Sequence, residues 1–180
     1  AGPRWRPPRP VGVLGQAAAM SSDHPEPLPS AIVEPVPRDL QALLRDDTAL
    51  VSVGHANNEI GTVQDVSGLA AVTHTAGAAL HLDAVQSAGW LPLAGLGADA
   101  VAIAGHKLGA PKGIGALAVR GRIPLEPLLH GGGQERGRRS GTENVAGAVG
   151  LAVALDLAEA ERSAASARVG AATRRVIAGI

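Results

Sequence analysis

The fold is decided by residues 98–119, which read ADAVAIAGHKLGAPKGIGALAV. Two short apolar runs, Ala98–Ala104 and Gly113–Val119, flank the polar turn GHKLGAPK. Short runs without polar alternation predict strands that are buried on both faces of a sheet. Because open α/β sheets bind their ligands at the carboxyl ends of the strands, this polar turn is a candidate functional site.

Strands and helices alternate in the sequence that precedes this stretch. Apolar runs predict strands at Ala49–Val53 and Ala79–Leu82, and the leucine spacing predicts a short helix over 40–44. A helix between the two strands is predicted by residues at helical intervals, namely Val66, Leu69, Ala70 and Thr73. The alternation predicts an α/β fold with a mainly parallel sheet and helices on both faces.

Proline content divides the chain into segments. Nine of the thirteen prolines lie in residues 1–37, which we expect to form an irregular N-terminal segment. Residues 38–165 contain the predicted strands and helices and form the expected core domain. Its last helix is predicted to begin with a hydroxyl cap within Ser140–Thr142, with Glu143 in the first turn. Residues 166–180 are expected to begin a linker or helix toward a C-terminal domain that this partial chain lacks.

Composition argues against several classes of function. Sixteen basic and sixteen acidic residues give a formal net charge of zero, which argues against a general nucleic-acid binder. The chain has no cysteine and therefore no disulfide, thiolate zinc site or thiol nucleophile, and its histidines show no metal-site spacing. Since no apolar run is long enough for a membrane span or a signal peptide, we expect a cytoplasmic protein.

Polar residues follow three of the predicted strands. Asn57 follows the first, Asp83 and Gln86 follow the second, and His106 and Lys107 follow the third. Taken singly, a lysine at a strand end usually extends into water, and an aspartate usually caps a turn. Together they supply the parts that pyridoxal phosphate needs, because a lysine bonds its aldehyde and a carboxylate keeps its ring nitrogen protonated.

Five motifs occur in the order and spacing of a known family. They read HANNEIGT (55–62), HLDAVQS (81–87), GHK (105–107), PKGIG (111–115) and HGGGQERGRRSGT (130–142). Through them, residues 45–160 closely resemble the cysteine desulfurases of the class V aminotransferase superfamily, which supply sulfur for iron–sulfur cluster assembly. The resemblance implies the central part of the large domain of a pyridoxal-phosphate-dependent transferase of fold type I. The implied reaction removes sulfur from L-cysteine and leaves L-alanine.

The resemblance also implies a role for each matching residue. Lys107 corresponds to the Schiff-base lysine and is a catalytic candidate, and Asp83 corresponds to the partner of the ring nitrogen. Gln86 and Asn57 correspond to contacts with the ring oxygen or the substrate. His106 corresponds to a contact with the cofactor phosphate.

Two further residues and the partners come from the same resemblance. Thr142 is expected to reach the phosphate of the neighbouring subunit in a homodimer. His24, within SSDHP (21–25), resembles the histidine that stacks on the ring and moves protons, and it is the second catalytic candidate. A sulfur acceptor or a scaffold protein is a further expected partner. The helix that begins near residue 145 fits packing within one subunit equally well.

Three departures from the family pattern leave alternatives open. Residues 1–20 contain no Gly-Ala-Thr-Glu phosphate turn, Ala104 stands where the family has a serine, and the cysteine that accepts sulfur is absent. The first interpretation is a partial cysteine desulfurase that is inactive alone. The second is another class V aminotransferase or lyase that needs no thiol. The third is a non-catalytic remnant that binds a partner.

Overall fold

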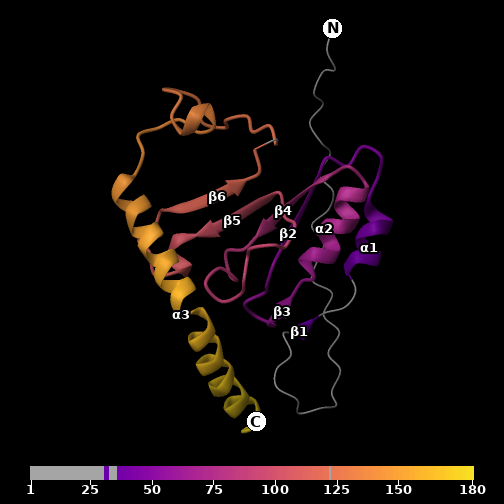
Figure 1. Cartoon of the computed structure of the whole chain (residues 1–180), viewed down its shortest axis with the longest axis vertical. Helices are drawn as coiled ribbons and strands as arrows, with labels where there is room; N and C mark the ends of the chain where they lie inside the picture. The colour runs from indigo at the N-terminus through magenta and orange to yellow at the C-terminus, as the bar shows by residue number, and fades with distance from the viewer. Residues whose placement is uncertain (1–30, 33–35, 122) are drawn as a thin grey trace.

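A four-stranded sheet forms the centre of the computed structural model, which describes residues 31–32, 36–121 and 123–180 (Figure 1). Its strand order is β2-β4-β5-β6, with bounds Leu50–Gly54, Ala79–Asp83, Ala100–Ala104 and Gly115–Val119. The first three strands are parallel and β6 runs antiparallel to β5. The structure confirms the mainly parallel sheet, and each predicted strand lies within two residues of its predicted limits.

Two helices pack on one face of this sheet. They are α1 (Val36–Leu43) and α2 (Val66–Thr75), which lie side by side (Figure 1). The carboxylate of Asp65 accepts a hydrogen bond from Gly68 N at 3.0 Å and so caps the first turn of α2. The core beneath the helices consists of Leu40, Val51, Val53, Val66, Leu69, Ala70, Ala78, Leu80 and Leu82. Each fully buried leucine stabilises the fold by about 1.5–3 kcal/mol, so small aliphatic residues suffice for this core.

The opposite face of the sheet is open in the described part of the chain. Side chains on this face include Leu50 on β2 and Leu117 on β6, which are 45% and 50% exposed. The sequence predicted helices on both faces of the sheet, whereas in the described part of the chain helices cover one face. The last helix, α3 (Val145–Ile177), packs on the loops that follow β4 and β5, and Ser166 Oγ donates to Trp90 O at 3.2 Å.

The structure differs from the sequence prediction in one additional strand and in the starting points of two helices. Residues 31–32 form β1, which pairs with β3 (Thr62–Val63), and α1 begins at Val36, although residues 1–37 were expected to be irregular. The cap of α3 is Asn144, whose Oδ1 accepts from Gly147 N at 2.9 Å, so the predicted hydroxyl cap is wrong. The hydroxyl of Ser140 instead accepts from Gly133 N at 3.3 Å within the preceding loop.

The long helix α3 continues without a break through residue 166, where the expected domain boundary lies. Its apolar residues at intervals of four are exposed, with Val145 at 68% and Val149 at 59%. Gly147 and Leu151 are the buried positions of this helix. None of the described helices is both long and apolar enough to cross a bilayer.

One half-buried carboxylate ties together the amino ends of β4 and β5. Asp99 Oδ2 accepts from Leu80 N at 2.9 Å and lies 2.7 Å from His74 Nε2. Burial raises the pKa of Asp99, but the hydrogen bonds from Leu80 and His74, together with nearby positive charge, outweigh it and leave this pKa below its ordinary value. The contact therefore stabilises the end of the sheet opposite the candidate site.

Candidate functional site

The strand register brings the predicted site positions to one edge of the sheet. Gly54 at the end of β2 pairs with Asp83 at the end of β4, and Asp83 pairs with Ala102 near the end of β5. The 3₁₀ turn Gly105–Lys107 follows β5 directly. The loop with Asn57 and the turn with Gln86 follow the other two strands. The sheet thus collects an amide, a carboxylate and an amine on neighbouring carboxyl ends.

Asn57 has a side chain whose orientation is fixed by its own loop. Its Oδ1 accepts from Glu59 N at 2.7 Å and from Ile60 N at 2.9 Å. Its backbone N–H donates to Thr62 O at 2.9 Å, which closes the loop as a short hairpin. Because both acceptor directions of Oδ1 are occupied, the Nδ2 group is the part of the amide that remains to donate to a ligand.

Asp83 and Gln86 lie on the turn that follows β4. Asp83 Oδ1 accepts from Val85 N at 3.0 Å, and the side chain is exposed. The second carboxylate oxygen, Oδ2, has no hydrogen bond within the described residues and is available to a ligand. Gln86 is half-buried beside it. This turn therefore offers a negative charge and an amide at one position.

Close backbone packing sets the direction of the turn that carries Lys107. A Cβ added at Gly105 would lie 2.7 Å from Ile114 Cγ2 and 3.0 Å from Ile114 O, so only glycine fits without a shift. The two segments are joined by a hydrogen bond from Gly105 N to Ile114 O at 2.9 Å. His106 and Lys107 follow with exposed side chains. Glycine here lets the strand end approach β6 and places the side chains of His106 and Lys107 outside the core.

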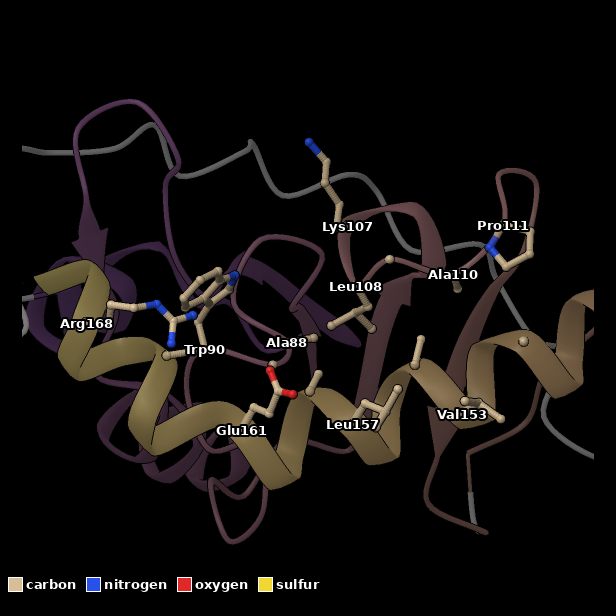
Figure 2. A pocket seen from close by; sticks show the side chains of 16 residues that line it. Ala88, Trp90, Lys107, Leu108, Ala110, Pro111, Val153, Leu157, Glu161 and Arg168 are labelled. Carbon is tan, nitrogen blue, oxygen red and sulfur yellow. The ribbon is translucent and has the colours of Figure 1, made fainter. Parts of the chain in front are cut away.

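A cavity of about 680 Å³ lies beside this turn, between residues 107–111 and α3 (Figure 2). Leu108, Val153 and Leu157 line it, and Figure 2 shows the amine of Lys107 pointing away from α3. Neither Asp83 nor Asn57 lines this cavity. Of the described polar side chains at the strand ends, Lys107 alone is among the lining residues, so the hollow borders that group on one side.

Sequence reasoning missed a buried pair that joins two of these segments. His55 Nδ1 lies 2.9 Å from Ser87 Oγ, and the two residues are 4% and 1% exposed. Burial lowers the pKa of His55, so the imidazole is neutral near neutral pH. The pair spans 32 positions in the sequence, and only the pairing of β2 with β4 brings the two side chains together.

Thr142 lies on the glycine- and arginine-rich loop that leads into α3. This loop is ordered by its own side chains, because Gln134 Oε1 accepts from Gly141 N at 3.1 Å. Glu135 and Arg136 adopt left-handed backbone angles, with φ of 51° and 58°. Thr142 itself is exposed, and in the described residues it makes no hydrogen bond to the other predicted site residues. The structure does not join it to the strand-end cluster.

His24 lies outside the described residues, so the structure gives no position for it. Within the described ranges, no group of three or more histidine, aspartate or glutamate side chains is arranged to hold a metal ion.

Comparison with known proteins extends over most of the chain. Residues 31–179 match the model of the family "Aminotransferase class-V". A cysteine desulfurase of Gluconacetobacter diazotrophicus is 51% identical over 135 residues, which are 74% of this chain and 34% of that protein. The cysteine desulfurase IscS of Shewanella baltica is 45% identical over 159 residues, which are 86% of this chain and 39% of the relative.

Solved structures give the same result for the fold. A NifS-like protein superimposes with a TM-score of 0.69 at 42% identity and covers 76% of this chain and 38% of its own. DndA from Streptomyces lividans gives a TM-score of 0.66 at 43% identity, with 76% and 40% covered. This chain therefore spans between a third and two fifths of the length of these relatives. The match of the family model to 149 of the 180 residues (31–179) shows that the chain belongs to the class-V aminotransferase family.

Proposed function

We propose that this chain is the cofactor-binding core of a cysteine desulfurase, with residues 38–165 as its core domain. The observation that carries the proposal is the placement of Lys107, Asp83 and Asn57 on the adjoining carboxyl ends of β5, β4 and β2. Relatives named as cysteine desulfurases are 45–51% identical to it, and a structure described as SspA in complex with cysteine superimposes with a TM-score of 0.64.

The donor set fits pyridoxal 5′-phosphate, the cofactor of this family. Bound to an amino acid, this cofactor withdraws electrons from the bonds of the α-carbon. The carboxylate of Asp83 is suited to hold a proton on the ring nitrogen, because its Oδ2 makes no hydrogen bond within the described ranges. The Nδ2 of Asn57 and the amide of Gln86 are suited to donate to the ring oxygen. Lys107 holds the exposed amine that the aldehyde requires.

The phosphate side of the site has two candidate residues. His106 adjoins Lys107 on the same exposed turn, and we assign it a phosphate contact. Thr142 is assigned to the phosphate of a second copy, as its place in the RSGT stretch of the family motif implies. His24 keeps its assignment as the residue that stacks on the ring. These assignments follow the family motifs of the sequence.

The proposed substrate of the family reaction is L-cysteine, with L-alanine and a sulfur atom as products. That reaction needs a thiolate that accepts the sulfur, and the sequence has no cysteine. We therefore propose that the chain alone does not make a persulfide, and that an acceptor or scaffold protein takes part. We also propose a homodimer, because α3 exposes Val145 and Val149, which are 68% and 59% exposed and are not among the residues that line the cavity. The proposed location is the cytoplasm, as expected from the sequence.

Two other functions remain as alternatives. A class V aminotransferase or lyase that needs no thiol is favoured by the absence of cysteine. A non-catalytic remnant is favoured by Ala104, which removes a hydroxyl from the phosphate side. Product analysis separates the first alternative from the main proposal, since alanine formed from cysteine supports desulfuration and a keto acid supports transamination.

The experiment that tests the proposal is an absorbance titration with pyridoxal phosphate, followed by borohydride reduction and peptide mass mapping. The chain has two lysines, Lys107 and Lys112, so the modified amine is assigned without ambiguity. We expect a visible absorption band in the wild type and in Lys112→Ala, and none in Lys107→Ala. A band that survives Lys107→Ala, or its absence from the wild type, contradicts the proposal.

A further inference from the structure

The buried His55–Ser87 pair has no role in the cofactor contacts proposed above. It joins the loop after β2 to the turn after β4 through the 2.9 Å contact of Nδ1 with Oγ. His55 N also donates to Asp83 O at 2.9 Å, and Gln64 N donates to His55 O at 2.9 Å. The backbone of His55 is thus fixed by two hydrogen bonds in addition to the side-chain contact.

The pair lies next to the two amides that the proposed site uses. His55 precedes Asn57 by two residues on one segment, and Ser87 directly follows Gln86 on the other. Ser87 is held in its turn because its backbone N–H donates to Ala84 O at 3.1 Å. A shift of His55 relative to Ser87 therefore moves Asn57 relative to Gln86. Since hydrogen bonds weaken steeply when distance and angle change, such a shift would remove donors from the ligand.

We propose that the His55–Ser87 hydrogen bond is a positioning element that holds the amides of Asn57 and Gln86 in register for one ligand oxygen. The inference rests on the proposed function, because that function assigns both amides to the ring oxygen. His55 and Ser87 are positioning residues here and touch no ligand. The low exposure of both residues excludes water as a competing partner and makes the contact specific.

A second pair on the same two strands provides a matched control. Ser52 Oγ lies 2.8 Å from His81 Nδ1, and this pair also joins β2 to β4. It is exposed and lies two residues before the strand ends, away from Asn57 and Gln86. A variant that lacks the Ser52 hydroxyl therefore loses the same kind of bond without changing the positions of the two amides.

The experiment compares Ser87→Ala, Ser87→Thr and Ser52→Ala in the full chain. The readouts are the dissociation constant for pyridoxal phosphate, the pH midpoint of the bound-cofactor absorption band, and urea unfolding without cofactor. We expect Ser87→Ala to weaken cofactor binding about fivefold and to shift the pH midpoint, as expected for the loss of a well-placed donor. Ser87→Thr keeps the hydroxyl and should restore both values, and Ser52→Ala should leave both unchanged.

A second pair of variants covers the case in which threonine does not fit the buried position. His55→Asn keeps a polar amide at the place of Nδ1 that can donate or accept a hydrogen bond, whereas His55→Leu keeps the bulk and removes the partner of Ser87 Oγ. Only His55→Leu should reproduce the Ser87→Ala shift of the pH midpoint. If the pH midpoint of the absorption band is the same in Ser87→Ala and in the wild type, the inference is overturned. The presence of the band in the wild type would still support the proposed function in that case. Absence of the band from the wild type overturns both.

Discussion

The packing around Gly105 makes a quantitative prediction about the turn that carries Lys107. In Gly105→Ala, the new Cβ would meet Ile114 Cγ2 at 2.7 Å, Ile114 O at 3.0 Å and Ala110 Cβ at 3.1 Å. The backbone oxygen cannot move without breaking the hydrogen bond from Gly105 N, so the turn must shift. Overpacking of this kind lowers the free energy of unfolding by about 1–3 kcal/mol. Alanine also restricts the unfolded chain more than glycine does, which offsets about 0.4–1 kcal/mol of this loss.

The matched control is Gly54→Ala, at the carboxyl end of β2, which lies two strands away from β5 in the same sheet. A Cβ there meets no heavy atom within 4 Å, so only the effect on the unfolded chain remains and the stability should stay equal or rise slightly. Urea unfolding at fixed pH measures both variants, and the midpoint should fall in Gly105→Ala alone. We also expect weaker pyridoxal phosphate binding in that variant, because the amine of Lys107 moves with the turn. Equal midpoints and equal binding in the two variants would refute the packing argument.

Three further predictions concern other parts of the molecule. Burial lowers the pKa of His55 below its ordinary value of 6.5. The stability that the neutral imidazole contributes is therefore present above pH 6.5 and is lost as the pH falls toward the lowered pKa. The variant His55→Asn does not titrate in this range, so it should flatten this part of a curve of unfolding free energy against pH. Asn144→Ala removes the cap of α3 and should lower the free energy of unfolding by about 0.5–2 kcal/mol in urea titrations, while Thr142→Ala should not. Ala104→Ser restores a hydroxyl on the phosphate side and should tighten pyridoxal phosphate binding about fivefold, as measured by absorbance titration. The control Ala102→Ser should leave binding unchanged. Unchanged binding in Ala104→Ser would contradict the phosphate assignment.

The strands and short helices could be predicted because their sequence patterns are local. Apolar runs such as Ala100–Ala104 carry the signal for a buried strand within a few residues. The two-residue strands β1 and β3 have no such pattern, since each exists through pairing with the other. The cap of α3 was misplaced for a related reason. Ser140 and Asn144 are both good cap residues, and only the fold of the preceding loop decides which one caps the helix.

The sequence predicted which strand ends carry the candidate site residues, but it did not predict the contacts between their side chains. Asp83 and Lys107 follow apolar runs, so their presence at one edge comes from the parallel order of the strands. The side-chain contacts that orient the site depend on register, which the sequence does not display. The bond between His55 and Ser87 exists because Gly54 pairs with Asp83, and a register shift of one residue would separate them.

The proposed cofactor site has more candidate contacts on its ring side than on its phosphate side, and this difference determines how tightly we expect the chain to bind the cofactor. On the ring side, the amine, the carboxylate and both amides are present on adjoining strand ends, with Asn57 oriented by two backbone hydrogen bonds. On the phosphate side, Ala104 lacks the hydroxyl that the family motif would supply, and His106 is the proposed phosphate contact on the turn that follows. A neutral hydrogen bond contributes about 1 kcal/mol net, so the loss of one weakens binding about fivefold. Weakened binding, rather than no binding, is therefore the expected behaviour, and the ring side alone carries the chemistry that distinguishes an enzyme from a remnant.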